Sequence, residues 1–467
     1  MKLNSFQENI YDLEEQKKLF DYDSIKLNPH LATDYAFEII KNSSRLNLAL
    51  FDKNVIKLKE KIYDIIEHKE LYDDLYKILS SIYGAFLADS MGSGTEFRSK
   101  DKNNHELIYK DGGIFKPGQV TDDSEMAMSQ AYGILDNYDY RNLNPNLLYY
   151  YYVLWSESNP SDIGTTTRAA LINLNLNKVN ITDENIFSEK IKNKISIKNS
   201  GSLANGYLMR ASPLLTWFYM VNKNYVIEII QTKSSNKYFE LYKKIHEEMA
   251  KDTQLTHPNR ETAIAGSIMI FMGLCSIQQK YSGKEILEMA SILLENSFFE
   301  EDEIGKTLKN IFKSNLNEFS KPNFSKDDFF SNLEIQMGFY RHAFNLTIYY
   351  LSVFDEQKKE MSLKDIYTNM MFDISDFGGD TDTNGAIVGM VMGPLIGMEN
   401  FDKKYFDVFL SFYSRQRILY TNVYMYFYAS YIIKLENKGL IIDKNASKVN
   451  FYFMQMILEM LNNEIKL

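Results

Sequence analysis

The sequence is poor in the residues that build several classes of protein. It contains one cysteine, Cys275, and so cannot form an internal disulfide, which fits a reducing compartment. It has 8 prolines in 467 residues, and few stretches alternate Val and Thr with polar residues, so the pattern does not favour β-sheets. Its longest uncharged apolar stretch, residues 386–398, is too short and too rich in glycine to span a bilayer.

Positive charge is also scarce. The formal net charge is -10, from 52 basic and 62 acidic residues, which argues against a broad nucleic-acid-binding surface. The first residues, "MKLNSFQENIYDLEEQKK", carry acids where a signal peptide needs an apolar segment. We therefore expect a soluble cytoplasmic protein without a secretion signal, and a buried structural thiol rather than a nucleophile at Cys275.

Apolar residues at helical spacing are abundant. They recur in segments such as "SEMAMSQAYGILDN", "ETAIAGSIMIFMGLCSIQQ" and "ASKVNFYFMQMILEMLNNEI", which predicts a mostly or wholly α-helical protein. Residues 1–74, rich in Asn, Lys, Asp and Glu, are interpreted as an N-terminal helical extension. Residues 75–467 are interpreted as the main domain with C-terminal helices, and the tyrosines crowded into residues 420–431 as core packing.

Two acid clusters each begin a predicted helix. Each offers one hydroxyl and two carboxylates: Thr121, Asp122 and Asp123 in "GQVTDDSEMAM", and Asp380, Asp382 and Thr383 in "GGDTDTNGAIVG". A lone cluster of this kind is usually a helix cap. With Glu96 in "ADSMGSGTEF", the set would be strongly repulsive without cations. Such hard oxygen ligands suit Mg²⁺ or Mn²⁺.

Glycines surround the second acid cluster. Gly378 and Gly379 precede it, as expected where the backbone turns sharply or lies close to another segment. Glycines then recur every four residues at Gly385, Gly389, Gly393 and Gly397, on one face of a helix. Each glycine costs about 1 kcal/mol in a helix interior, so the stripe predicts that another backbone packs tightly against this face.

These segments resemble those of the ADP-ribosylglycohydrolase family. The motifs "GAFLADSMGSGTEF", "GQVTDDSEMAM", "SLANGYLMRASPL", "LTHPNRETAIAG" and "GGDTDTNGAIVGMVMGPLIG" occur in the family's order and approximate spacing, over about residues 75–400. The resemblance implies an all-α orthogonal helical bundle of the ADP-ribosylglycohydrolase type, here with N- and C-terminal helical additions. It also implies a centre of two Mg²⁺ or Mn²⁺ ions at the bottom of a cleft.

The resemblance also implies roles for individual residues. The metal ligands would be Thr121, Asp122, Asp123, Asp380, Asp382 and Thr383, with Asp123 and Asp382 counted among the catalytic residues. Glu96 or Asp162, the latter in "SDIGTTT", would handle the proton. The substrate contacts would be Gly201, Ser202 and Asn205 along the pyrophosphate and ribose, and His257 near the adenosine.

Several residues keep a second interpretation. From the sequence alone, His257 fits a structural role as well as a ligand-binding one. Arg210 is interpreted as a buried structural partner and Asp89 as a support for the fold. Leu203 and Ala204 depart from the small residues common in the family's phosphate loop, which predicts a tighter pocket.

The leading prediction is a hydrolase that removes ADP-ribose from modified protein side chains, with arginine as acceptor. One alternative is an immunity-type protein that blocks an ADP-ribosyltransferase toxin with residues 1–74, with or without hydrolysis. Another is a hydrolase of serine-linked substrates, modified nucleic-acid ends or small ADP-ribosyl compounds. Retention of both acid clusters argues against a relative that has lost catalysis. A monomer is the default expectation.

Overall fold

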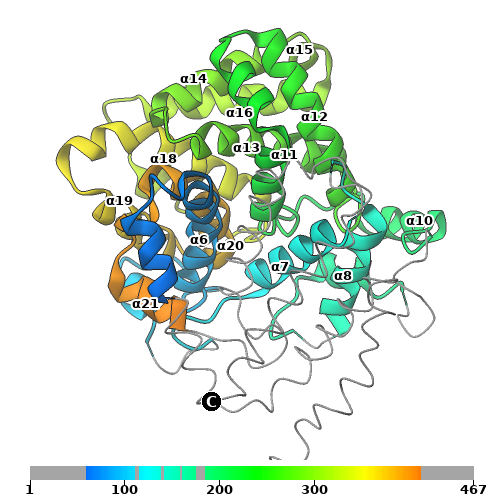
Figure 1. The fold of residues 1–467 in the computed structure, drawn as a ribbon, viewed down its shortest axis with the longest axis horizontal. Coiled ribbons are helices and arrows are strands. Elements are labelled where there is room, and N and C mark those ends of the chain that lie inside the picture. The colour runs from blue at the N-terminus through cyan, green and yellow to red at the C-terminus, as the bar shows by residue number, and fades with distance from the viewer. Residues whose placement is uncertain (1–58, 111–114, 138–140, 158–159, 175–184, 412–467) are drawn as a thin grey trace, which may run out of the picture.

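The computed structural model describes residues 59–110, 115–137, 141–157, 160–174 and 185–411. Over these ranges the chain is helical, and its β-type pairing consists of two isolated bridges, Arg98 with Gly379 and Ala204 with Phe339. The prediction of an all-α fold is confirmed for this part of the chain (Figure 1).

Some connections between the α-helices are short, whereas others are long, such as residues 93–121. In chain order they are α6 (Asp73–Gly92), η2 (Asn104–Leu107), α7 (Asp122–Leu135), α8 (Pro145–Glu157), α9 (Thr165–Leu171), α10 (Glu189–Asn199), α11 (Ser212–Gln231), α12 (Ser235–Thr253), α13 (Arg260–Ile277), α14 (Gly283–Leu294), α15 (Phe298–Glu301), α16 (Glu303–Phe319), α17 (Lys326–Phe329), α18 (Tyr340–Glu360), α19 (Leu363–Phe377), α20 (Thr381–Ile396), η4 (Met398–Asn400) and α21 (Lys403–Ser411).

Helices α6 and α20 pack closely side by side at the centre of the fold (Figure 1). A Cβ atom added to Gly84 of α6 would lie 2.5 Å from the carbonyl oxygen of Gly389 and 2.8 Å from the Cα of Gly393. At Gly385, an added Cβ would lie 3.1 Å from the Ala88 carbonyl oxygen. The glycine stripe therefore lets two backbones touch, as the sequence predicted.

The last glycine of the stripe has a different role. Gly397 is not inside the helix but ends α20, with φ of 79°, a left-handed conformation that suits glycine. The sequence analysis was therefore wrong to extend the helix through this position. The stripe in the helix interior consists of Gly385, Gly389 and Gly393.

Helix α13 lies in the core. It is long and apolar enough to cross a membrane by length and composition, but 89% of its apolar window is buried inside the protein, as in the core helices of soluble proteins. Cys275 lies on this helix and is fully buried, in agreement with its interpretation as a structural thiol. Burial raises the pKa of the Cys275 thiol well above its usual value.

The described residues before α6 also contribute to the core. Ile62 and Ile65 are completely buried, and the Tyr63 hydroxyl donates to Asp407 Oδ1 of α21 at 2.8 Å. Most of the predicted extension and the tyrosine-rich segment fall in 1–58 and 412–467, outside the described residues. The division at residue 74 therefore stays a prediction.

Candidate metal centre

The first acid cluster is positioned by a carboxylate from another helix. Thr121 is the N-cap of α7, and its hydroxyl accepts a hydrogen bond from the Asp123 N–H at 3.4 Å. Asp89, fully buried on α6, accepts the Thr121 N–H at 3.0 Å and the Ser124 N–H at 3.2 Å. A carboxylate that accepts the free N–H groups of a helix start is favoured by their charge. Asp89 therefore anchors the start of α7, in line with its interpretation as a support for the fold.

The second acid cluster is placed by glycines. Gly378 and Gly379 both have positive φ, of 72° and 79°, so they turn the chain from α19 into α20. The Gly379 N–H donates to the Arg98 carbonyl at 2.8 Å. An added Cβ on Gly92 would lie 2.5 Å from the Cα of Asp382. These glycines allow the start of α20 to lie directly against the end of α6.

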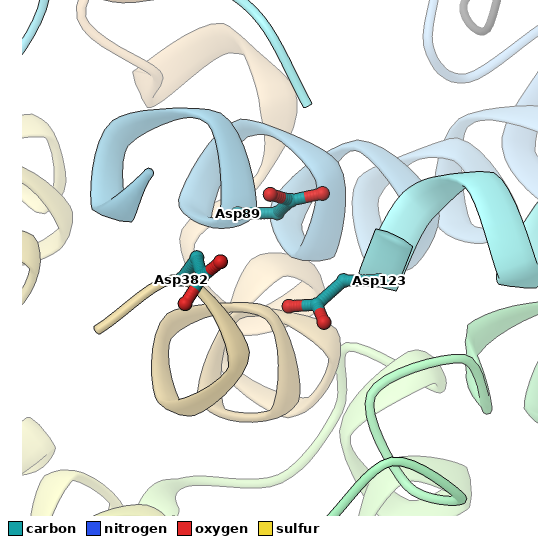
Figure 2. A group of neighbouring side chains, drawn as sticks. All are labelled: Asp89, Asp123 and Asp382. Carbon is teal, nitrogen blue, oxygen red and sulfur yellow. The ribbon is translucent and has the colours of Figure 1, made fainter. Parts of the chain in front are cut away.

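The carboxylates from these segments converge in two groups. Asp89, Asp123 and Asp382 have ligand atoms within 4.8 Å of one another, and so do Glu96, Asp380 and Asp382. Figure 2 shows that the first group comes from three helices, with Asp382 facing both other carboxylates. Because Asp382 belongs to both groups, the two groups form one continuous cluster of carboxylates that could hold metal.

Several oxygens in this centre are buried and have no hydrogen-bond partner within the described part of the chain: Glu96 Oε2, Asp123 Oδ2 and Asp382 Oδ1. An unpaired buried carboxylate oxygen is costly. Other oxygens are held in place, since Thr383 Oγ1 donates to Asp123 Oδ1 at 3.0 Å and Asn205 Nδ2 to Asp380 Oδ2 at 2.6 Å. The donor set is all oxygen and rich in carboxylates, and so it fits hard divalent cations such as Mg²⁺ or Mn²⁺.

The electrostatics of the centre point the same way. Burial, and then the charges of Asp380, Asp162 and Asp122, raise the pKa of Glu96 to about 9. Burial and neighbouring carboxylates also raise the pKa values of Asp122, Asp123 and Asp382 well above the usual range. A bound cation reverses this effect, because it favours the charged carboxylates.

Asp162 lies near the same centre, in the segment before α9. Its charge contributes to the raised pKa values of Glu96, Asp122 and Asp380, which are carboxylates of distant parts of the sequence. The structure thus brings the predicted catalytic carboxylates and metal ligands into one region.

The predicted substrate loop lies beside the acids. Asn205 reaches Asp380 directly, whereas the Ser202 hydroxyl lies 3.0 Å from the Thr166 hydroxyl. Gly201 is exposed, with nothing within 4 Å of an added Cβ. The loop is held to the start of α18, because the Asn205 N–H donates to the Gly338 carbonyl at 2.8 Å.

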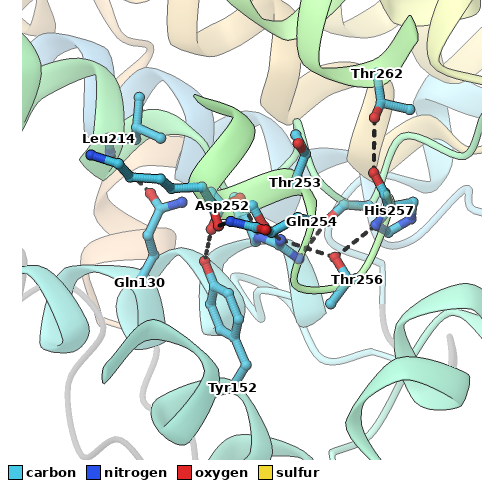
Figure 3. A network of polar contacts seen from close by, with 12 residues as sticks. Gln130, Tyr152, Leu214, Asp252, Thr253, Gln254, Thr256, His257 and Thr262 are labelled. Carbon is cyan, nitrogen blue, oxygen red and sulfur yellow. Dashed lines mark hydrogen bonds and ion pairs between the residues drawn. The ribbon is translucent and has the colours of Figure 1, made fainter. Parts of the chain in front are cut away.

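A buried polar network around Asp252 and Thr256 lies next to this loop in the chain and contacts Gly206 (Figure 3). The guanidinium of Arg210 donates to Asp252 Oδ2 from Nε at 3.1 Å and from Nη2 at 2.9 Å, and Nη1 donates to the Gly206 carbonyl at 3.2 Å. Tyr152 donates to the other Asp252 oxygen at 2.5 Å. Arg210 is completely buried, which confirms its interpretation as a structural partner.

His257 belongs to the same network (Figure 3). Its side chain is 1% exposed, and Nδ1 lies 2.8 Å from the Thr256 hydroxyl. A Cβ added to Gly206 would lie 3.1 Å from its ring. Burial, and then the charge of Arg210, lower the pKa of His257 to about 3. The ring therefore lies neutral beside the substrate loop, and contact with adenosine stays a prediction.

The sequence analysis missed some residues of this region. A Cβ added to Gly338 would lie 3.5 Å from Asn205 Oδ1 and 3.8 Å from Asp380 Oδ2, so this glycine borders the acids. The hydroxyls of Thr95 and Thr381 lie 2.9 Å apart, and both donate to the Gly92 carbonyl. Thr95 and Thr381 lie within quoted motifs and could have been singled out, but Gly338 carried no local signal.

Comparisons with known proteins identify similar sequences and one similar structure. The sequence matches the family model described as ADP-ribosylglycohydrolase over residues 71–418. It is 27% identical over 333 residues to a predicted ADP-ribosyl glycohydrolase of Acanthamoeba polyphaga mimivirus, covering 68% of this chain and 86% of that protein. A solved structure titled as an ADP-ribosylglycohydrolase-related protein complex aligns with a TM-score of 0.48 and 16% identity, covering 78% of this chain and 99% of the other.

Proposed function

Because the chain belongs to the ADP-ribosylglycohydrolase family, we propose that it is a metal-dependent hydrolase that removes ADP-ribose from modified protein side chains, with arginine as the acceptor. The observation that supports this proposal most is the pair of carboxylate groups that share Asp382. A centre of this kind, rich in buried and unpaired oxygens, is expensive to maintain unless it binds cations.

The residues that would hold two Mg²⁺ or Mn²⁺ ions are those that begin α7 and α20: Thr121, Asp122, Asp123, Asp380, Asp382 and Thr383. When bound, such ions supply orientation of the ribose hydroxyls and stabilisation of the charge that develops as the glycosidic bond breaks. Asp89 and Asn205 would keep these ligands in place through the hydrogen bonds to the start of α7 and to Asp380.

Proton transfer would fall to Glu96 or Asp162. Each lies near the acid centre, and each could take a proton from an attacking water or deliver one to the leaving group. Glu96 Oε2 is buried and has no hydrogen-bond partner among the described residues, so it is free to take or give a proton. Asp162 is half-buried like Glu96, and its Oδ1 accepts the Ile163 N–H at 2.8 Å.

The remaining predicted contacts would bind the rest of the ligand. Gly201 and Ser202 lie at an accessible edge of the loop that carries Asn205, where N–H and O–H donors would meet the pyrophosphate. The guanidinium of Arg210 already donates hydrogen bonds to Asp252 and to the Gly206 carbonyl. It would therefore act on the ligand only by fixing the loop.

The test is release of free ADP-ribose from a polypeptide ADP-ribosylated on arginine. Wild-type protein is assayed with Mg²⁺, with Mn²⁺ and with EDTA, beside Asp122→Asn and Asp380→Asn. Asp328→Asn, an exposed acid on α17, is the matched control. We expect metal-dependent release that falls at least about 100-fold in the two cluster variants, by analogy with the loss of one electrostatic group from an active site, and is retained in the control.

The outcomes separate the alternatives. Release of ADP-ribose from a serine-linked substrate but not from the arginine-linked one would mean that the acceptor is serine. The proposed metal-dependent hydrolysis would still stand. Metal-independent release, or release that survives both cluster substitutions, would contradict the metal centre. No release from any substrate, with tight binding of an ADP-ribosyltransferase, would favour the blocking protein instead.

A further inference from the structure

Two exposed apolar residues lie on segments that contact the turn before Asp380. Among the described residues, the large hydrophobic side chains that are well exposed are Leu71, Phe97, Ile172, Ile197, Ile335 and Val408. Scattered exposed hydrophobics are normal in proteins. Phe97 and Ile335 differ from the others in position, because both lie on segments that contact the Gly379 turn immediately before Asp380.

Phe97 is fixed to this turn by its backbone. It directly follows Glu96, whose carboxylate lies within 4.8 Å of those of Asp380 and Asp382. The Phe97 N–H donates to the Gly379 carbonyl at 2.8 Å, yet 56% of the residue is exposed. Its φ is 63°, a left-handed conformation that is strained for a residue other than glycine. The fold therefore holds a strained backbone that presents a phenyl ring to solvent.

Ile335 lies on a second segment that contacts the same turn. A Cβ on Gly379 would lie 2.5 Å from the Leu333 carbonyl oxygen, so the segment carrying Ile335 packs against the glycine. The Ile335 carbonyl accepts from His342 Nε2 at 3.0 Å, and the residue is 60% exposed. The Lys100 N–H donates to Glu334 Oε2 at 3.2 Å, which joins this segment to the one carrying Phe97.

We infer that Phe97 and Ile335 form an apolar rim that contacts the polypeptide part of an ADP-ribosylated substrate. The inference rests on the proposed function. A substrate whose glycosidic bond lies at the acid centre must carry its acceptor outwards past the segments that border the centre. Apolar side chains there add binding energy with a polypeptide. A nucleic-acid end fits less well, because its phosphates would meet a chain of net charge -10.

The rim sets a preference for modified polypeptides over small modified compounds. A small ADP-ribosyl compound with the same linkage reaches the acid centre without covering Phe97 or Ile335. Loss of either side chain therefore lowers kcat/KM for the polypeptide, mainly through KM, and changes the value for the small compound much less.

The experiment compares a modified polypeptide with the same modified amino acid alone, both carrying the linkage that the wild-type protein hydrolyses. An oligonucleotide ADP-ribosylated at its terminal phosphate is the third substrate. The variants are Phe97→Gly and Ile335→Ala. Glycine adopts the positive φ of position 97 without strain, so Phe97→Gly removes the ring while keeping the backbone. Phe97→Leu restores an apolar side chain. Leu71→Ala is the matched control, since this residue is 78% exposed and precedes α6, whose far end carries the acid centre.

We expect the ratio of kcat/KM for the polypeptide to kcat/KM for the amino acid to fall about tenfold in Phe97→Gly and in Ile335→Ala. This is the loss of affinity that removal of an important interface side chain typically causes. The ratio should recover in part in Phe97→Leu and stay unchanged in Leu71→Ala. An unchanged ratio in the rim variants would overturn the inference while leaving the hydrolase intact. A loss confined to the oligonucleotide would overturn it in favour of a nucleic-acid acceptor. Absence of release from every substrate by wild-type protein would overturn the proposed function and this inference with it.

Discussion

At the scale of single residues, the environment decides what each side chain can do. Asp89 and Asp123 are both fully buried carboxylates, but Asp89 accepts hydrogen bonds from the start of α7 whereas Asp123 keeps one oxygen unpaired among the described residues. A satisfied carboxylate positions its neighbours, and an unsatisfied one is available to a cation. The same residue type thus serves two purposes a few ångströms apart.

The pH dependence of stability is a prediction at this scale. Because the folded state lowers the pKa of His257 to about 3 from 6.5, the unfolded chain binds more protons between these values. The contribution of His257 to the free energy of unfolding is present above pH 6.5 and is lost as the pH falls towards 3, at up to about 1.4 kcal/mol per pH unit. Denaturant unfolding of wild type and His257→Gln between pH 7 and 4.5 measures it.

The slope of unfolding free energy against pH should be smaller in His257→Gln than in wild type. His68→Gln is the control, because this histidine is exposed, with 54% of its side chain accessible. If the slope of unfolding free energy against pH were equal in all three proteins, His257 would take up a proton in the folded state as easily as in the unfolded state. It would then not be buried away from solvent beside the substrate loop.

At the scale of the helix, the contact between α6 and α20 determines where the acids lie. The two helices meet through glycine, so their axes lie closer than ordinary side chains permit. The start of α20 then carries Asp380 and Asp382 to the end of α6, where Glu96 follows. Any change that pushes the helices apart also moves the carboxylates.

Gly84→Ala tests this arrangement. The new Cβ would lie 2.5 Å from the Gly389 carbonyl oxygen, and overpacking of this kind costs about 1–3 kcal/mol or more, against a gain of about 1 kcal/mol in helix propensity. We expect a net loss of unfolding free energy of about 2 kcal/mol where the overlap dominates, measured by denaturant titration. Gly164→Ala, where nothing lies within 4 Å of an added Cβ, should stay within about 0.5 kcal/mol of wild type.

A more stable Gly84→Ala protein would contradict this account, because it would mean that α6 and α20 separate freely. In that case the glycine stripe would not be what holds the acid clusters together.

At the scale of the whole molecule, the carboxylates of the acid centre repel one another when charged, and the rest of the fold must hold them together. These carboxylates come from the ends of α6, α7 and α20 and from the segments around Glu96 and Asp162. Burial raises the pKa values of these acids, which shows that charged carboxylates are unfavourable there without cations. Bound metal would therefore stabilise the folded protein as a whole.

Thermal unfolding with and without divalent cation tests this prediction. Since a ligand that binds only the folded state stabilises it by mass action, a cation at 100 times its Kd should add about 2.7 kcal/mol. We expect a higher Tm in Mg²⁺ or Mn²⁺ than in EDTA, and a much smaller difference in Asp382→Asn, which removes the carboxylate shared by both groups. An equal Tm in all conditions would count against a metal centre.

The sequence by itself determined the helical class, the acid clusters at helix starts and the glycine stripe, because each is a local pattern of spacing or composition. It also allowed a resemblance to be recognised, from which the ligand set followed. The structure confirmed the helices and the burial of Cys275 and Arg210 and brought the predicted acids together. It corrected the position of Gly397. A glycine four residues after Gly393 has the same spacing in the sequence whether it lies inside the helix or ends it.

Only the tertiary structure decided which groups from distant segments meet. Gly338 borders Asp380, Asn205 donates to it, and Asp89 caps α7, because chain segments far apart in sequence pack together. The sequence did not reveal that the segments carrying Phe97 and Ile335 both contact the Gly379 turn, because no local pattern distinguishes these exposed apolar residues from others. Contacts between distant segments depend on the packing of the whole core, and no short-range pattern carries that information.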